Sequence, residues 1–242
     1  KNEWLTSGPK VKLFEQKMAN YCNVPYAAAV SNGTVALDIA LKTIGIGLGD
    51  EVIVPAMTYF SSASSVSYQF AIPVFVDIEK ENYNLDPSKI ANAITKKTKA
   101  IMFIDYGGNP SNQSDIFKIS KKYGLTVIQD GAQSLGGIYQ GKPACANAEI
   151  STMSFHMAKI LSCIEGGMVF THRKKFIDEI TIRRNQGEPL DKKYEHILLG
   201  TNARMTELQA GIGLVQLKKL KMFLKERKRV AKFYDELFNE SK

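Results

Sequence analysis

The chain has 242 residues, 44% of them apolar and 23% charged, and its 32 Lys and Arg against 24 Asp and Glu give a formal net charge of +8. This composition is typical of a globular protein and excludes a disordered, collagen-like or low-complexity chain. The length suffices for one large α/β domain or two small ones, with a core that needs no disulfide or metal to stabilise it.

Short β-branched runs alternate with amphipathic stretches, a pattern typical of βαβ units in a largely parallel sheet. The expected strands are residues 27–30, 51–54, 74–77, 100–104, 126–130, 149–155 and 167–171. The expected helices begin at about residue 34 and then cover 61–70, 86–94, 114–123, 174–184 and, almost continuously, 204–238. We therefore predict an α/β fold with helices flanking the sheet.

The first candidate site is the turn Ser31-Asn32-Gly33-Thr34, which leads from a strand into a helix. Glycine and a hydroxyl at a helix start expose N–H groups where the helix dipole is positive, which favours a bound phosphate. Ser, Asn and Thr are also the usual N-cap residues, so plain capping is the favoured interpretation of this segment taken alone.

The second candidate is Asp130, at the end of the apolar strand 125–130. Ligands bind at the carboxyl ends of strands in open α/β sheets. A carboxylate there can keep a pyridine nitrogen protonated, as enzymes that use pyridoxal 5'-phosphate (PLP) require. The alternative is a helix cap in the turn that follows.

The third candidate is Lys159, in an apolar stretch just after an expected strand. Lysine is seldom buried without a partner, and desolvation favours the neutral amine that forms a Schiff base. The alternative is a lysine whose amine reaches the surface.

These three candidates occur in this chain order, each at the end of an expected strand. With the blocks around them, the sequence resembles the DegT/StrS-type sugar aminotransferases, a family of fold-type-I PLP enzymes. The resembling blocks lie at residues 7–9, 31–37, 49–55, 73–77, 130–133, 154–167, 200–205, 207–210 and 216–217.

The resemblance implies roles for four residues around the cofactor ring. Lys159 corresponds to the Schiff-base lysine and proton shuttle, and Asp130 to the partner of the pyridine nitrogen. Gln133 would lie near the cofactor's hydroxyl group, and Tyr59 would stack on the ring.

The resemblance also implies a phosphate site shared between two subunits. Gly33, Thr34 and Ser154 would hold the phosphate together with Asn202 of a second copy, so a homodimer with shared active sites is expected. The nearby His156 is expected to position neighbouring groups or to pack, without a catalytic role.

The implied reaction moves an amino group from an amino acid, usually glutamate, through PLP and its amino form PMP to a nucleotide-linked keto-sugar. One alternative is a PLP- or PMP-dependent sugar dehydratase, although such relatives carry His at the position of Lys159. A second is a PLP-binding protein without turnover, either regulatory or truncated.

Two departures from the family pattern concern the cofactor region and the domain organisation. Gln129 and Gly131 stand where many relatives have Glu and Ala. Family members also continue into a small C-terminal domain. We expect a PLP-binding large domain over residues 1–203 and helices over 204–242 that lead toward a small domain largely absent from this chain.

Cellular location and other partners follow from three negative patterns. Cys22, Cys145 and Cys163 form no CxxC pair, which argues against a disulfide framework or a zinc site and favours a reducing compartment. No run approaches the roughly 18 apolar residues of a membrane helix, and residues 1–8 are too polar for a signal peptide. The basic clusters accompany no nucleic-acid-binding motif. We expect a cytoplasmic protein without metal, membrane or nucleic-acid partners.

Overall fold

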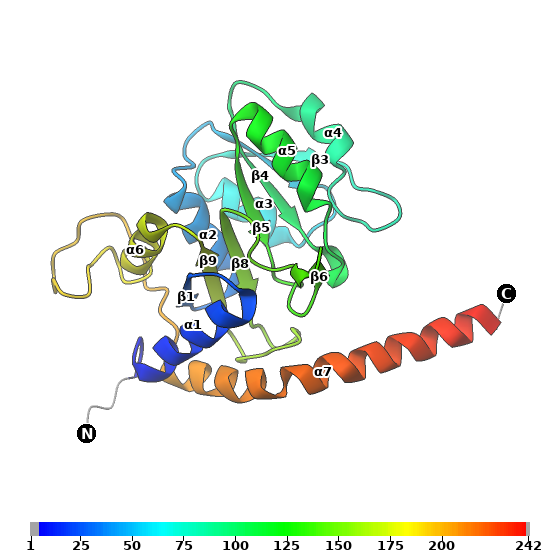
Figure 1. Ribbon diagram of the computed structural model, residues 1–242. Coiled ribbons are helices and arrows are strands. Elements are labelled where there is room, and N and C mark those ends of the chain that lie inside the picture. Colours follow the sequence, from blue (N-terminus) through cyan, green and yellow to red (C-terminus); the bar gives the residue numbers. More distant parts are fainter. Residues whose placement is uncertain (1–4, 241–242) are drawn as a thin grey trace.

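The structure, a computed structural model, describes residues 5–240 and contains a sheet of seven strands in the order β1-β9-β8-β5-β4-β2-β3 (Figure 1). The strands are β1 Tyr26–Val30, β2 Glu51–Pro55, β3 Ile72–Val76, β4 Thr98–Ile104, β5 Thr126–Asp130, β8 Ile150–Ser154 and β9 Gly167–Thr171. Strand β9 runs antiparallel to β8 and β1, and the other pairs in this sheet are parallel. The predicted α/β fold and each of its seven strands are confirmed.

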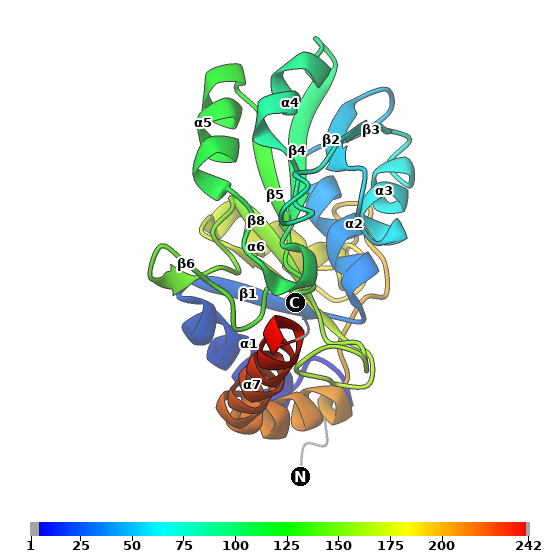
Figure 2. The ribbon, with the colours of Figure 1, turned by 90° about the vertical axis from the view of Figure 1, so that its right-hand side faces the viewer.

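Helices cover both faces of the sheet (Figure 2). They are α1 Pro9–Cys22, α2 Gly33–Thr43, α3 Phe60–Ser67, α4 Pro87–Ala93, α5 Gln113–Tyr123, α6 Lys174–Arg183 and α7 Glu207–Glu240. Helices α2, α3 and α6 pack on one face, and α1, α4 and α5 on the other. None of the helices over residues 5–240 is long and apolar enough to cross a membrane.

Strand β4 illustrates why the sheet is covered on both sides. Ala100 and Met102 belong to the apolar cluster formed with α2, whereas Ile101 and Phe103 belong to the cluster formed with α5, and all four are fully buried. Since successive side chains of a strand point to opposite faces, a continuous apolar run needs a cover on each.

Besides the 3₁₀ turn Tyr106–Gly108, two parts of the structure were not among the expected elements, and the first is helix α1. Val11, Phe14 and Met18 bury its inner face, but none of its own side chains caps its first turn. The cap comes from Glu207, the first residue of α7, whose carboxylate oxygens accept the N–H groups of Lys10 and Val11, each at 2.9 Å.

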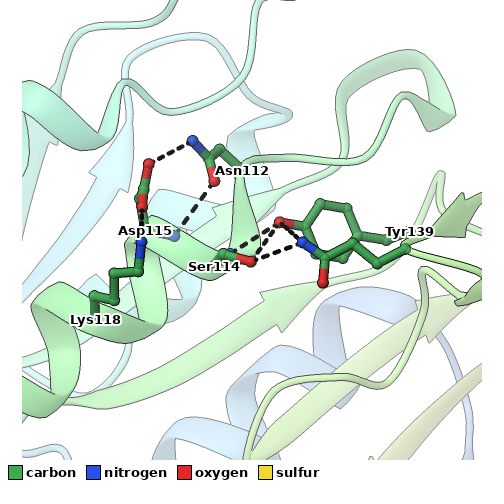
Figure 3. A network of polar contacts seen from close by, with 6 residues as sticks. Asn112, Ser114, Asp115, Lys118 and Tyr139 are labelled. Atoms are coloured by element: carbon green, nitrogen blue, oxygen red, sulfur yellow. Dashed lines mark hydrogen bonds and ion pairs between the residues drawn. The ribbon is translucent and has the colours of Figure 1, made fainter.

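The second is the short hairpin of β6 Ile138–Tyr139 and β7 Lys142–Pro143. Its Tyr139 hydroxyl accepts the N–H of Ser114 at 3.1 Å and lies 2.8 Å from the Ser114 Oγ (Figure 3). The hairpin is thus attached to the first turn of α5, where Asn112 provides the N-cap.

Helix α7 is one continuous helix of 34 residues. Its first turns pack against α1, with Ala210 and Leu220 in the same apolar cluster as Phe14. Its later turns extend past the sheet (Figure 1).

Candidate active site

A hollow of about 630 Å³ opens where β4, β5 and β8 end and α2 begins. Parallel strands deliver their carboxyl ends to one edge of the sheet, which is where ligands of open α/β folds bind. Of the eight site residues expected from the sequence, seven line the hollow: Gly33, Thr34, Tyr59, Asp130, Gln133, Ser154 and Lys159. Residues from distant parts of the chain are therefore brought together in this hollow.

The N-terminus of α2 forms one wall of the hollow. The Asn32 side chain caps the helix by accepting the N–H of Val35 at 2.9 Å, so the capping interpretation of this segment holds. The first N–H groups of a helix have no partner within it, and those of Gly33 and Thr34 lie in the hollow's wall. Capping and anion binding are therefore compatible here.

Gly33 also lets the end of β8 approach this helix closely. A Cβ at Gly33 would lie 2.8 Å from the Cβ of Ser154, closer than side-chain carbons approach one another. The absence of a side chain leaves the helix N–H groups and the Ser154 hydroxyl beside the same space. A phosphate group fits this combination of donors.

Asp130 lies at the floor of the hollow and is 2% exposed. One carboxylate oxygen accepts the Ser62 hydroxyl at 2.8 Å, and the other accepts the N–H of Ala132 at 3.2 Å. Burial raises the pKa of Asp130, while the Ser62 hydrogen bond and the charge of Lys159 lower it. A cation placed against this carboxylate would relieve the cost of burying its charge.

Lys159 reaches the hollow from the turn after β8, where its N–H donates to the carbonyl of His156 at 2.9 Å. The lysine is half-buried, and the apolar residues beside it differ in exposure: Met157 is 72% exposed, whereas Leu161 is fully buried in the core cluster that Ile160 also contacts. The predicted apolar stretch therefore lies partly in the core, and Lys159 lies near its exposed end, where it lines the hollow.

Tyr59 and Gln133 lie at the rim. Tyr59 is the residue before α3 and is 71% exposed, so its ring is available to a group in the hollow. The Gln133 side-chain oxygen accepts the N–H of Gly107 at 2.8 Å, which fixes the amide in one orientation.

Asn202 does not line this hollow and is exposed. It pairs with Asn185 in an isolated β-bridge, beside Ala203, whose carbonyl accepts the N–H of Ser31 at 2.9 Å. Within one chain the structure thus separates Asn202 from the other expected site residues.

Two further residues of the site were not predicted from the sequence. Ser62 holds Asp130 from α3, and Glu165 lines the hollow opposite His156, whose Nε2 lies 3.7 Å from a Glu165 oxygen. Ser62 lies in a serine-rich helix without a motif, so only its contact reveals it. Glu165 lies within the block 154–167 and could have been found there.

Comparison with known proteins agrees with this geometry. The sequence pattern of the DegT/DnrJ/EryC1/StrS aminotransferase family matches residues 1–242. The chain belongs to this family. It is 40% identical over 234 residues to the GDP-perosamine synthase of Caulobacter vibrioides, covering 96% of this chain and 63% of that protein. The chain therefore spans less than two thirds of that relative's length.

Solved structures show the same likeness. A DegT/DnrJ/EryC1/StrS aminotransferase from Brucella abortus superimposes with a TM-score of 0.94 at 32% identity, covering 98% of this chain and 65% of that one. A Streptococcus pneumoniae protein described as a sugar aminotransferase, in its PLP form, gives a TM-score of 0.93 at 30% identity, covering 99% and 66%. PLP is the cofactor of this family.

The residues of the hollow fit PLP. Asp130 is a buried carboxylate without a cation bonded to it, the start of α2 offers donors to a phosphate, and Lys159 lines the same hollow with its amine. Among residues 5–240, no group of three or more His, Cys, Asp or Glu side chains is placed to hold a metal ion.

Proposed function

We propose that the protein is a PLP-dependent aminotransferase that moves an amino group from an amino acid, expected to be glutamate, to a nucleotide-linked keto-sugar. The observation that carries this proposal is the convergence of Lys159, Asp130 and the start of α2 on one hollow. The acceptor class is supported by relatives whose names specify GDP-linked, dTDP-linked and UDP-linked sugars.

In the proposed mechanism each residue has one task. Bound PLP supplies a protonated ring that takes up the electron pair left when the donor's Cα loses a proton. The amine of Lys159 would hold the cofactor before the donor arrives, and would then take the proton from the donor's Cα and deliver it to C4′ of the cofactor. Asp130 keeps the ring nitrogen protonated, and the first turn of α2 with Ser154 anchors the phosphate.

The first test replaces Lys159 by Ala. The purified protein with PLP, reduced by borohydride, should carry a covalent adduct that the Lys159→Ala protein lacks. Lys174→Ala is the matched control, because Lys174 also follows a strand of this sheet but is paired with Asp178 at the surface. An adduct that persists in Lys159→Ala would refute the assignment.

Addition of glutamate then separates the alternatives. Glutamate should convert bound PLP to PMP, with loss of the PLP absorbance and release of 2-oxoglutarate. A protein that binds PLP through Lys159 but does not respond to any amino donor would be a regulator or a binder. Release of a dehydrated sugar without amination would support a dehydratase.

We further propose a homodimer whose active sites are shared, with Asn202 holding the phosphate in the partner subunit. The exposure of Asn202 supports this, as does the segment before it, residues 185–201, which exposes four apolar side chains. They are Leu190, Tyr194, Ile197 and Leu199. These four side chains are the surface that we expect a second copy to cover.

A mixed dimer tests the shared site. One subunit carries Lys159→Ala and the other Asn202→Ala, so a shared arrangement gives one site with both changes and one site with neither. The mixed dimer should then regain activity that each altered homodimer lacks. Absence of recovery, with the dimer verified, would place both residues in the same subunit's site.

We propose two further properties of the protein. The large domain would extend over residues 1–203, with 204–242 leading to a smaller domain, in keeping with relatives longer than this chain. A cytoplasmic location is supported by the buried free thiols of Cys22, Cys145 and Cys163, which suit a reducing compartment.

A further inference from the structure

Asp105 is a wholly buried carboxylate that lies outside the hollow. It directly follows β4, the neighbour of the strand that ends in Asp130, and its exposed fraction is 0%. Burial raises the pKa of Asp105, while its hydrogen bonds lower it. A buried acid requires partners, and its partners indicate its role.

Three donors converge on Asp105. One oxygen accepts the backbone N–H of Ser111 at 2.9 Å, and the other accepts the Gln129 amide at 2.8 Å and the Ser134 hydroxyl at 2.6 Å. A carboxylate is required here because it offers an acceptor oxygen both to Ser111 on one side and to Gln129 and Ser134 on the other. An asparagine in its place would turn one N–H toward another N–H.

One of these contacts, and the turn that follows Asp105 in the chain, lead to Gln133 at the rim of the hollow. Ser134 is the next residue, so its bond to Asp105 fixes the backbone on one side of Gln133. The turn after Asp105, Tyr106–Gly108, holds the Gln133 side chain through the N–H of Gly107.

The approach between these two segments is close. A Cβ at Gly108 would lie 2.9 Å from the carbonyl oxygen of Gln133, and Gly108 has a φ of +84°. The turn therefore touches both the side chain and the backbone of Gln133, and Asp105 lies at its base.

We propose that Asp105 is a positioning residue that holds Gln133 in the orientation required for binding PLP. The proposal rests on the proposed function, since it concerns the same hollow. Asp105 touches neither the hollow nor Lys159, and it acts through Ser134 and the turn 106–108. The contacts of Asp105 with Ser111 and Gln129 belong to the same network and stabilise the fold around it.

The first experiment is a double-mutant cycle on PLP binding, followed by absorbance with Asp105→Asn, Gln133→Ala and the double variant. Asp105→Asn should weaken PLP binding about tenfold, the size of one net hydrogen bond. If Asp105 acts through Gln133, the double variant should bind PLP within about twofold of Gln133→Ala alone, because coupled residues are not additive. Independent, multiplying effects would overturn the proposal, as would unchanged binding in Asp105→Asn.

Two further variants keep this test decisive if Asp105→Asn does not fold. Ser134→Ala removes only one of the three donors and should weaken PLP binding by about threefold. Gln113→Ala is the control: Gln113 is equally buried and bonds to Ala144 and Asn147, on the far side of the network from Gln133. It should leave PLP binding unchanged, and a loss equal to that of Ser134→Ala would overturn the proposal.

Amide hydrogen exchange gives a readout without cofactor. Asp105→Asn and Ser134→Ala should accelerate exchange at Gly107 and residues 133–137, whereas Gln113→Ala should accelerate it at 144–147 only. Failure of the unaltered protein to bind PLP would refute the proposed function. Unchanged exchange at Gly107 in both Asp105→Asn and Ser134→Ala would refute the positioning role, whatever the cofactor does.

Discussion

Asp130 is buried in the cofactor-free protein, and no cation is bonded to its carboxylate. Both properties make the charged form of Asp130 unfavourable. Because burial raises its pKa above the ordinary value of 3.8, the native state binds more protons than the unfolded state as the pH rises past 3.8. The contribution of Asp130 to stability is then fully present below pH 3.8, and it is lost as the pH rises through the pKa of Asp130 in the native state. The carboxylate that we propose as the partner of the cofactor ring thus weakens the fold of the cofactor-free protein.

We expect Asp130→Asn to raise the melting temperature of the cofactor-free protein at pH 7, by roughly 2–4 °C for each kcal/mol recovered. The amide oxygen can still accept the Ser62 hydroxyl, and the gain from removing the buried charge should exceed the cost of turning the amide N–H toward the N–H of Ala132. Calorimetry at pH values from about 3.5 to about 8 should show the gain shrinking toward the acid end. A lower melting temperature at pH 7 would contradict this account.

The same substitution should act in the opposite direction on catalysis. Asp130→Asn is expected to retain PLP but to lose transamination by about a thousandfold, since it removes the charge that stabilises the protonated ring. Single-turnover conversion of bound PLP by glutamate measures this step. Ordinary kinetics in the variant would leave Asp130 as a cap of the turn that follows β5.

At the scale of the elements, the start of α2 depends on the side chain of Asn32, which caps the helix. Asn32→Ala removes the cap on Val35 and should cost about 1 kcal/mol of stability. PLP binding should weaken as well, because the first turn of the helix frays. Asn32→Ser keeps an acceptor at this position, so it should restore most of both quantities in denaturant and PLP titrations. An equal loss in both variants would exclude capping as the cause.

The close approach of β9 to this turn is a second property of the elements. A Cβ at Gly167 would lie 2.3 Å from the carbonyl oxygen of Asn32, which is backbone and cannot rotate away. Gly167→Ala should therefore destabilise the protein by about 1–3 kcal/mol, as overpacking does, and should weaken PLP binding. Gly211→Ala on α7 is the control, because its new methyl would meet only the flexible end of Lys10 at 3.5 Å. Equal unfolding midpoints for the two variants would contradict this assignment.

The strands and most helices could be predicted because local patterns specify them, and strand ends then located Asp130 and Lys159. The apolar spacing of Val11, Phe14 and Met18 is typical of a helix, so α1 could have been predicted from the sequence. The β6–β7 hairpin was not predictable, because its attachment depends on the distant Ser114. The role of Asn202 stays a prediction, since it concerns a second chain.

At the scale of the whole molecule, Glu207 links the first helix to the last. Glu207→Ala should destabilise the protein by about 1–3 kcal/mol, because the N–H groups of Lys10 and Val11 lose a charged acceptor. Urea unfolding should show a lower midpoint with an unchanged slope. Glu226→Ala, which removes an exposed acid of the same helix paired only with Arg229, should change the midpoint little. Equal effects of the two variants would exclude the cap.

This cap also determines when the fold can be completed during synthesis. The acceptor for Lys10 lies 197 residues further along the chain, which is roughly 10–40 s of translation at about 5–20 residues per second. Strand β1 likewise waits for β9, with which it pairs. Helix α1 is therefore made well before the residues that stabilise it, and its apolar face around Phe14 stays uncovered on the ribosome until Glu207 emerges.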